Sequence, residues 1–314
     1  MTIKNPTADG NQETYQEQYC SSHITGGIQN QLIILSVVNI FLSITALLGN
    51  TLTLVALHKE SSLHPPSKIL VLSRNLATTD LCAGITAGPL IATYWMIVVS
   101  ERWDICRFAV DTTFIASYML CSVSLLTLAS ISVDRLLVLL LGLRYRQVVT
   151  LRRTYVIIIF LGVVSIVVSM MSLWNYLISS WYSYTVIPLC LVTSISSYTR
   201  IFLTLRHHQT QVQDNIQGQQ NQTTHFHIAR YKKAVSSAMW LQLTLVLCYL
   251  PYNVVGALSI QTERLTPSFY LARQCTNTLV YLNSSINPII YCWKIREVRQ
   301  AVKDTIRQLL WSSS

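Results

Sequence analysis

Long apolar runs dominate the chain, and charged or proline-marked breaks separate them. Between these breaks the runs cover residues 32–57, 69–98, 108–141, 154–178, 184–205, 234–259 and 268–293. A helix needs about 20 apolar residues to cross the roughly 30 Å of hydrocarbon in a bilayer, and each run reaches that length. The pattern therefore predicts an all-α integral membrane protein, folded as a bundle of seven transmembrane helices.

The composition favours a membrane protein over a soluble domain. Of the 314 residues, 51% are apolar and 11% are charged, whereas soluble domains carry roughly 25% charged residues. The net charge of +10 is compatible with a nucleic-acid partner, but the basic residues cluster at the ends of apolar runs. We therefore expect membrane lipids around the protein and no nucleic-acid partner.

The distribution of basic residues predicts the orientation of the chain. If the loops after the first, third and fifth spans share one side with the C-terminal tail, that side holds 18 of the 23 lysine and arginine residues. The other side holds Lys4, Arg102, Arg107, Arg264 and Arg273. Because basic residues concentrate in cytoplasmic loops, we expect an extracellular N-terminus and a cytoplasmic C-terminus.

Three segments flank or interrupt the predicted bundle of residues 32–293. Residues 1–31 are polar and lack the pattern of a cleaved signal peptide, so we expect an extracellular N-terminal segment. Residues 207–229 are rich in Gln, Asn and His and predict a flexible cytoplasmic loop. In residues 294–314 apolar positions at helical spacing lie opposite basic ones, which indicates a C-terminal amphipathic helix on the inner leaflet and a tail. A disordered basic tail is the alternative.

A few polar side chains lie deep in the predicted spans. Asp80 lies in the middle of the second span, and amide and hydroxyl side chains lie at similar depth in three other spans: Asn50, Ser124, Asn283, Ser284 and Asn287. An ionisable group inside a bilayer is costly unless it is paired or hydrated. These groups can converge on one hydrated cavity, whose oxygen atoms suit a small hard cation or a proton. Alternatively, they only hydrogen-bond the helices to one another.

Two prolines are predicted to bend helices beside polar residues. Pro251 lies in the sixth span, and Pro288 follows Asn287 near the inner end of the seventh. Proline removes a backbone donor and kinks a helix, which lets Asn287 and Tyr291 turn inward. Such bends are natural hinges, so the pattern is compatible with a two-state switch.

The chain resembles the rhodopsin-like family of G-protein-coupled receptors over nearly all of residues 32–310. The motifs that carry the resemblance follow in the family's order: Gly49-Asn50, Asn75 to Asp80, Ser124, Asp134-Arg135-Leu136, Tyr198, Cys248 to Pro251 and Asn287 to Tyr291. The resemblance implies a plasma-membrane receptor rather than an enzyme. It also implies that an extracellular ligand shifts the conformational equilibrium and thereby activates a heterotrimeric G protein.

The resemblance further implies roles for single residues. It implies an interior sodium pocket, with Asp80 and Ser124 as metal ligands, formed by Asn50, Asp80, Ser124, Asn283 and Asn287. It implies G-protein coupling and switch roles, with Arg135 meeting the G protein, for Asp134, Arg135, Tyr198, Tyr249, Pro251, Asn287, Pro288 and Tyr291. Apart from this allosteric sodium ion we expect no cofactor, and no retinal, because Tyr281 stands at or near the lysine position of opsins.

Four positions depart from the family pattern. Tyr249 replaces the usual tryptophan of the sixth span, Leu245 replaces a phenylalanine, and Cys190 stands where the fifth span usually has its proline. Tyr231 stands where an acidic partner of Arg135 is frequent. Loss of that partner predicts appreciable basal activity.

The outer loops also depart from the pattern. The connection between the fourth and fifth spans, expected near residues 179–187, contains no cysteine. A bridge from Cys106 to Cys190 is disfavoured by distance, which leaves Cys20, Cys106 and Cys275 as candidates for an extracellular disulfide. The short loop and the missing proline resemble the melanocortin, cannabinoid and adenosine branch.

The predicted ligand pocket has few charges. We expect it to include Ser117, Cys121, Tyr249, Tyr252, Asn253 and Tyr281. Ser117 stands at the aspartate position of aminergic receptors, which disfavours a protonated amine, and Gly256 stands where adenosine-type recognition needs an asparagine. The melanocortin-type acidic cluster is not reproduced either. The apolar and aromatic lining favours a small neutral or lipid-like ligand, or a peptide.

Three other functions are compatible with a helical membrane protein. A transporter or ion-conducting protein commonly shows internal repeats, which this sequence lacks. An intramembrane enzyme needs converging metal ligands or a nucleophile, whereas the histidines lie outside the spans. A decoy receptor that does not signal stays open, because Leu245 and Tyr249 alter the connector between ligand and G protein.

Overall fold

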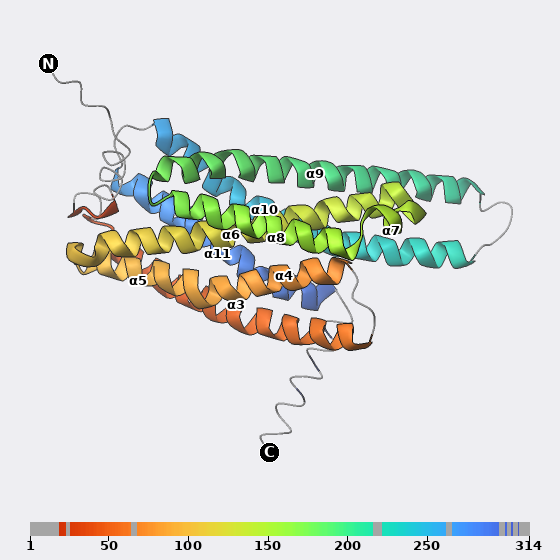
Figure 1. The fold of residues 1–314 in the computed structure, drawn as a ribbon, viewed down its shortest axis with the longest axis horizontal. Helices are drawn as coiled ribbons and strands as arrows, with labels where there is room; N and C mark the ends of the chain where they lie inside the picture. Colours follow the sequence, from red (N-terminus) through yellow and green to blue (C-terminus); the bar gives the residue numbers. More distant parts are fainter. Residues whose placement is uncertain are drawn as a thin grey trace.

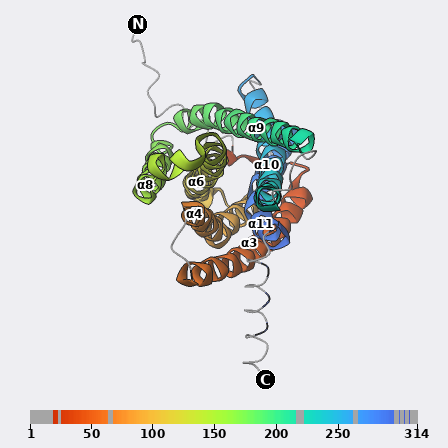
Figure 2. The same ribbon diagram turned by 90° about the vertical axis from the view of Figure 1, so that its right-hand side faces the viewer.

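The structure is a computed structural model that describes residues 19–22, 26–63, 68–215, 222–261 and 266–294, together with Arg299, Lys303 and Arg307. The long helices run lengthwise beside one another (Figure 1). Viewed along the bundle they surround a common interior (Figure 2). Helix α6 packs against α4, α5, α8, α9 and α10, so it is the central helix of the bundle.

Within the described residues, seven helical spans follow one another along the chain. The first span is α3 (Gln29–Leu63). The second consists of three consecutive helical segments, α4 (Lys68–Cys82), the π-helical turn η1 (Ala83–Ala87) and α5 (Gly88–Val99). The third is α6 (Trp103–Leu141). Two short elements come next, η2 (Gly142–Arg144) and α7 (Tyr145–Val148). The last four spans are α8 (Leu151–Met171), α9 (Tyr176–Asn215), α10 (Gln222–Gln261) and α11 (Pro267–Lys294). The predicted all-α seven-helix bundle is confirmed.

Six of the spans are long and apolar enough to cross a bilayer by length and composition, among the described residues. They are Gln29–Lys59, Lys68–Val99, Trp103–Leu141, Leu151–Met171, Leu177–Thr204 and Met239–Ser259. Helix α11 falls short because it carries polar side chains such as Gln274, Asn283 and Asn287, which are buried inside the bundle. Large apolar side chains such as Ile34, Phe160 and Leu247 instead face outward, where lipid tails solvate them.

A glycine allows two helices to approach closely. A Cβ atom added at Gly49 of α3 would lie 2.8 Å from Cβ and 2.9 Å from Cγ of Pro288 on α11. Real Cβ atoms do not approach that closely, so any side chain at position 49 would push the two helices apart. Small residues at helix contacts are a common device for packing in membranes.

A disulfide ties the N-terminal segment to α6. Cys20 and Cys106 are joined, with Cα atoms 5.9 Å apart, while Cys275 is free. Among the three cysteines left open by the sequence, the structure thus selects one pair. We call the end of the bundle that carries this bridge the disulfide end, and the opposite end the α7 end (Figure 1).

The fifth span differs from its prediction in two ways. Helix α8 ends at Met171 and α9 begins at Tyr176, so the connection lies before residues 179–187 rather than within them. Ser179 is fully buried and its hydroxyl donates to the carbonyl of Val168 on α8. Ser179 therefore joins α9 to α8 inside the bundle and is not part of a loop. The span also contains a proline, Pro188, two residues before the position occupied by Cys190.

Parts of the predicted loop 207–229 are helical in the described residues. Helix α9 continues to Asn215 and α10 begins at Gln222. Glutamine is a good helix former, and helices that already span a bilayer extend into such a segment without a new nucleation step. The predicted C-terminal amphipathic helix falls largely outside the described residues, as does most of the N-terminal segment.

Candidate functional site

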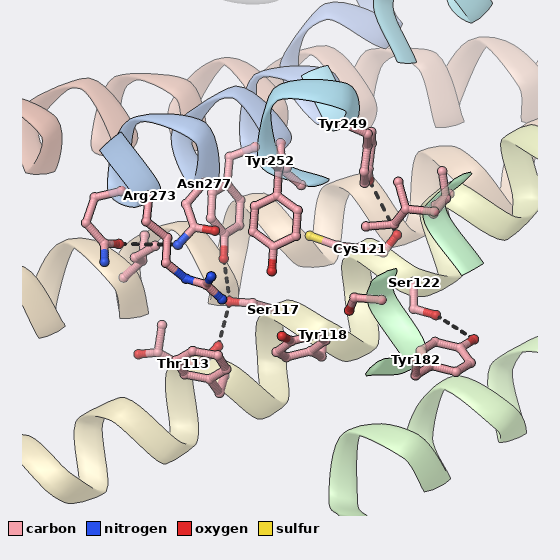
Figure 3. Close-up of a pocket in the computed structure, with 18 of the residues that line it drawn as sticks. Thr113, Ser117, Tyr118, Cys121, Ser122, Tyr182, Tyr249, Tyr252, Arg273 and Asn277 are labelled. Carbon is pink, nitrogen blue, oxygen red and sulfur yellow. Dashed lines mark hydrogen bonds between the residues drawn. The ribbon is translucent and has the colours of Figure 1, made fainter. Parts of the chain in front are cut away.

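A cavity opens between α5, α6, α9, α10 and α11 near the disulfide end. Seven tyrosines line it: Tyr19, Tyr94, Tyr118, Tyr182, Tyr249, Tyr252 and Tyr281. Apolar side chains such as Ile91, Val186 and Val280 form much of the remaining wall. Figure 3 shows labelled side chains from α6, α9, α10 and α11 in this wall, among them Tyr118, Tyr182 and Tyr252. A mostly apolar pocket with a few polar groups is typical of a small-molecule site.

Four of the five residues predicted only for the ligand pocket line this cavity. They are Ser117, Cys121, Tyr252 and Tyr281, and Tyr249 lines it as well. Asn253 does not line this cavity. Neighbouring residues of a helix point about 100° apart, and Tyr252 takes the direction of the cavity. Asn253 is instead buried, and its Nδ2 makes no hydrogen bond to a described residue.

Hydrogen bonds cross the cavity between helices. Ser117 on α6 and Tyr281 on α11 share a short hydrogen bond. Ser122 on α6 contacts Tyr182 of α9 at 3.2 Å and accepts from Ser165 of α8 at 3.0 Å. A ligand that alters these contacts would change how α6 is held against its neighbours.

One described residue of the N-terminal segment, Tyr19, lines the cavity. The ring of Tyr19 packs edge to face against Phe114 and Tyr270, with centroids 5.9 and 5.7 Å apart. Its backbone carbonyl accepts a hydrogen bond from Tyr94 at 3.1 Å. Because the neighbouring Cys20 is bridged to α6, the disulfide holds Tyr19 at the cavity wall.

The cavity also contains a cation that the sequence reading did not place there. Arg273 of α11 lines the wall and is only 7% exposed. The sequence reading counted it among the outer basic residues, because the apolar run gives a span but not the direction of each side chain. Helix periodicity supplies a signal: Arg273, Asn277 and Val280 recur at spacings of four and three, and all three line the cavity.

A polar cluster lies deeper in the bundle around Asp80, which is fully buried. Ser124 and Ser284 donate to Oδ1 of Asp80 at 3.0 and 2.8 Å, and Asn287 donates to Oδ2 at 2.7 Å. Asn50 donates to the backbone carbonyl of Ser284 at 3.1 Å. The structure therefore brings helices α3, α4, α6 and α11 together at this carboxylate, and adds Ser284 to its direct partners.

The cluster retains unpaired oxygen atoms. Oδ1 of Asn50, Asn283 and Asn287 is buried without a hydrogen-bond partner among the described residues. Asp80 has three neutral donors and, within the same residues, no basic partner. Buried acceptors and a carboxylate without a counter-ion are the donor set that a hard cation or water would satisfy.

Three of the predicted coupling residues, Asp134, Arg135 and Tyr198, lie toward the α7 end, whereas Tyr249 lines the cavity and Asn287 bonds to Asp80. Asp134 is buried and accepts a hydrogen bond from Tyr145 of α7 at 2.5 Å. Partial burial and this bond to the carboxylate raise the pKa of Tyr145. Tyr198 of α9 forms an apolar cluster with Ile201 of the same helix and with Leu136 and Leu139 of α6. The side chains of Tyr231 and Tyr291 lie outside the described residues.

A second contact near this end was missed from the sequence. Ser132 of α6 donates to Oε1 of Gln242 on α10 at 3.3 Å, and both residues are buried. A polar residue in an apolar run is the only signal that marks Gln242. The contact joins α6 to the proline-containing helix α10.

Comparison with known proteins identifies the family. A family model described as 7 transmembrane receptor (rhodopsin family) matches residues 49–180 and 173–291. The chain belongs to this family. It is a G-protein-coupled receptor and a multi-pass membrane protein.

The receptor is similar to several curated proteins at about one quarter identity. It is 25% identical over 319 residues to Probable G-protein coupled receptor 45 of Homo sapiens, which covers 88% of this chain and 82% of that protein. It is 24% identical over 310 residues to Adenosine receptor A2a of Canis lupus familiaris, an alignment that covers 86% of this chain and 71% of that protein. It is 25% identical over 297 residues to Adenosine receptor A3 of Ovis aries, an alignment that covers 84% of this chain and 86% of that protein. Adenosine receptors are thus among the proteins to which this chain is similar, which is consistent with the adenosine part of the predicted resemblance.

Proposed function

We propose that the receptor binds an extracellular ligand in the tyrosine-lined cavity and passes the signal to a G protein at the α7 end. The observation that carries this proposal is the position of the cavity. It lies beside the Cys20–Cys106 bridge, whereas Asp134 and Arg135 lie at the opposite end of α6. One helix thus joins a ligand site at one end of the bundle to a coupling site at the other.

The disulfide supports an extracellular N-terminus. Disulfides form and persist in oxidising compartments and are rare in the cytosol. The bridge therefore favours an extracellular disulfide end and a cytoplasmic α7 end. The concentration of basic residues in the loops and tail of the α7 side favours the same orientation.

The Asp80 cluster lies between the two ends. Cys121 and Tyr281 line the cavity, while Ser124 and Ser284, each three residues farther along the same helices, bond to Asp80. Asp134 follows ten residues after Ser124, about 15 Å along the helix. A ligand that moves α6 against α11 would strain or relieve this cluster and so shift the equilibrium between resting and active states.

Sodium fits the cluster. Asp80 and Ser124 would supply ligand oxygens, and the unpaired carbonyl oxygens of Asn50, Asn283 and Asn287 would complete the pocket. A bound sodium ion would supply the positive charge that the carboxylate lacks. It would favour the conformation in which the surrounding helices remain packed around it.

The relatives and the packing at Gly256 bear on whether the ligand is a nucleoside. The adenosine receptors among its relatives make a nucleoside a compound to test. In this receptor, however, the space that a side chain at Gly256 would occupy is filled by Tyr184 of α9. An asparagine cannot be placed there without moving that ring, which argues against adenosine-type recognition at this position.

A cavity-filling substitution tests the proposal. Cells expressing the receptor are screened for G-protein activation with a panel of nucleosides, lipids, amines, carboxylic acids and peptides. Ser117→Phe puts a large ring into the cavity and is expected to weaken every active compound at least about tenfold. The matched control, Thr112→Phe, adds the same ring to α6 at a residue outside the cavity wall.

Two outcomes would contradict the proposal. If an activating compound acts equally on Ser117→Phe and on the control, the ligand binds elsewhere. If no compound gives a response although the receptor is confirmed at the cell surface, a decoy receptor is favoured instead.

A further inference from the structure

Arg273 is a buried cation in the wall of the ligand cavity. The residue is 93% buried. Among the described residues that line the cavity, no other carries a charge. Figure 3 shows its guanidinium reaching from α11 toward α6, where Ser117 and Tyr118 lie. A guanidinium stays protonated under all physiological conditions, so the charge cannot be removed by releasing a proton.

Its partners are neutral and leave much of the group unused. Nη1 donates to Oγ of Ser259 at 2.9 Å and to the hydroxyl of Tyr184 at 3.4 Å. Its Cζ lies 5.9 Å from the centroid of the Tyr252 ring, at the outer limit of a cation–π contact. Nη2 and Nε make no hydrogen bond to a described residue. Arginine therefore presents free donors at the cavity.

No acidic residue of the described chain neutralises this charge. The wall contains neither aspartate nor glutamate, and the ion pair found within the described residues joins Arg102 to Asp104. Burying a charge without a counter-charge costs free energy. The cost is also seen when one partner of a buried ion pair is removed, because the remaining charge is then left unpaired. A structure that retains such a cation beside a ligand cavity is suited to a partner that arrives with the opposite charge.

We propose that Arg273 recognises the carboxylate of a small organic acid. This inference rests on the proposed function and names its ligand class. The planar guanidinium matches a carboxylate through two parallel hydrogen bonds, and its unused Nη2 and Nε are the neighbouring pair that such a fork requires. The inference revises the neutral, lipid-like or peptide ligand that the sequence favours.

The rest of the cavity fixes the other features of the ligand. One cation balances one negative charge, so a monoanion fits better than a nucleotide or another phosphate ester with two or more charges. The tyrosine rings and apolar side chains beyond Arg273 suit an aromatic or aliphatic body. The ligand is therefore a single carboxylate on an apolar body.

Two helices hold the guanidinium in place. Gly256 of α10 leaves room for the ring of Tyr184, whose hydroxyl accepts from Arg273. Ser259, three residues farther along α10, accepts the second bond. The arginine is thus oriented by α9 and α10 while its backbone belongs to α11, so a bound carboxylate would act on three helices at once.

Paired compounds that differ only in charge test the inference. The thermal midpoint of the purified receptor in detergent is measured against concentration of 3-phenylpropionate, 4-phenylbutyrate and octanoate. The same measurement is made with their methyl esters and primary amides, and with phenyl phosphate as a dianion. We expect at least one carboxylate to raise the midpoint, with its ester and amide at least about tenfold weaker.

Substitutions then assign the charge to one residue. Arg273→Gln is expected to weaken binding of the active carboxylate by about 10- to 100-fold, with little change for its ester. Arg273→Lys keeps the positive charge but lacks the planar fork of donors. Its affinity for the carboxylate is expected to lie between that of the unmodified receptor and that of Arg273→Gln. The control is Arg102→Gln, which removes an exposed arginine at the disulfide end and is expected to bind like the unmodified receptor.

The outcomes separate this inference from the proposed function. If Ser117→Phe abolishes binding but acids and esters bind alike, or Arg273→Gln binds the acid normally, the cavity is correct and the anion inference fails. Failure of every carboxylate to raise the midpoint also overturns the inference, and equal binding of phenyl phosphate overturns the preference for one charge. If Ser117→Phe has no effect on any ligand, the proposed cavity itself is wrong.

Discussion

Asp80 shows how one side chain can link several helices. Its carboxylate accepts from Ser124, Ser284 and Asn287, which belong to two other helices, and it has no basic partner within the described residues. Three neutral donors reduce the cost of burying the charge but leave it unneutralised. A cation bound beside Asp80 would therefore stabilise the folded receptor.

Replacing this carboxylate tests the sodium site without a ligand. We expect sodium chloride to raise the thermal midpoint of the purified receptor relative to choline chloride at equal ionic strength. At a concentration several times the dissociation constant, bound sodium contributes about 1 kcal/mol. Asp80→Asn is expected to remove this difference, because a neutral amide replaces the carboxylate that would hold the ion.

A second variant controls for the loss of a buried polar group. Ser165→Ala removes a buried hydroxyl of α8 that bonds to Ser122 and does not contact Asp80. It should retain the sodium-dependent rise. A rise that persists in Asp80→Asn would leave the cluster as a set of hydrogen bonds between helices and nothing more.

At the scale of the helices, small residues decide which neighbours can approach. Helix α3 packs against both α5 and α11. Its contact with α11 includes Gly49, which has no room for a side chain beside Pro288. Gly162 of α8, by contrast, has open space where its Cβ would lie.

These two glycines form a matched pair for a packing experiment. Gly49→Ala is expected to destabilise the receptor by about 1–3 kcal/mol, since the new methyl group forces α3 and α11 apart. Gly162→Ala makes no clash and improves helix propensity by about 0.5–1 kcal/mol, so no loss is expected. Thermal midpoints and surface expression of both variants give the comparison. Equal loss in both would contradict a specific contact between α3 and Pro288.

For the whole molecule, orientation decides which end meets the ligand. The disulfide and the basic loops both favour an extracellular N-terminus. An epitope tag before Met1 should therefore bind antibody on intact cells, and a tag after Ser314 should bind only after permeabilisation. The reverse result would place the tyrosine-lined cavity in the cytosol and would end the proposed assignment of ligand and coupling sites.

The sequence determined the number and order of the spans because a bilayer demands long apolar helices, but it misplaced the connection between the fourth and fifth spans. It also identified Asp80 and its neighbours, because a polar group in hydrocarbon is conspicuous. It could not show that Ser284 would be a direct partner of Asp80 while Asn283 would not. That difference depends on the rotation of α11, which packing against α3 and α10 sets.

Two assignments show what only the tertiary structure decided. Ser179 reads as part of a polar loop, but its hydroxyl bonds to α8 inside the bundle. Arg273 reads as an outer basic residue, but the packing of α9, α10 and α11 encloses it at the ligand cavity. Hydropathy fixes which segments enter the membrane. The direction and partner of each polar side chain depend on how the helices rotate against one another, and a single chain read along its length does not contain those contacts.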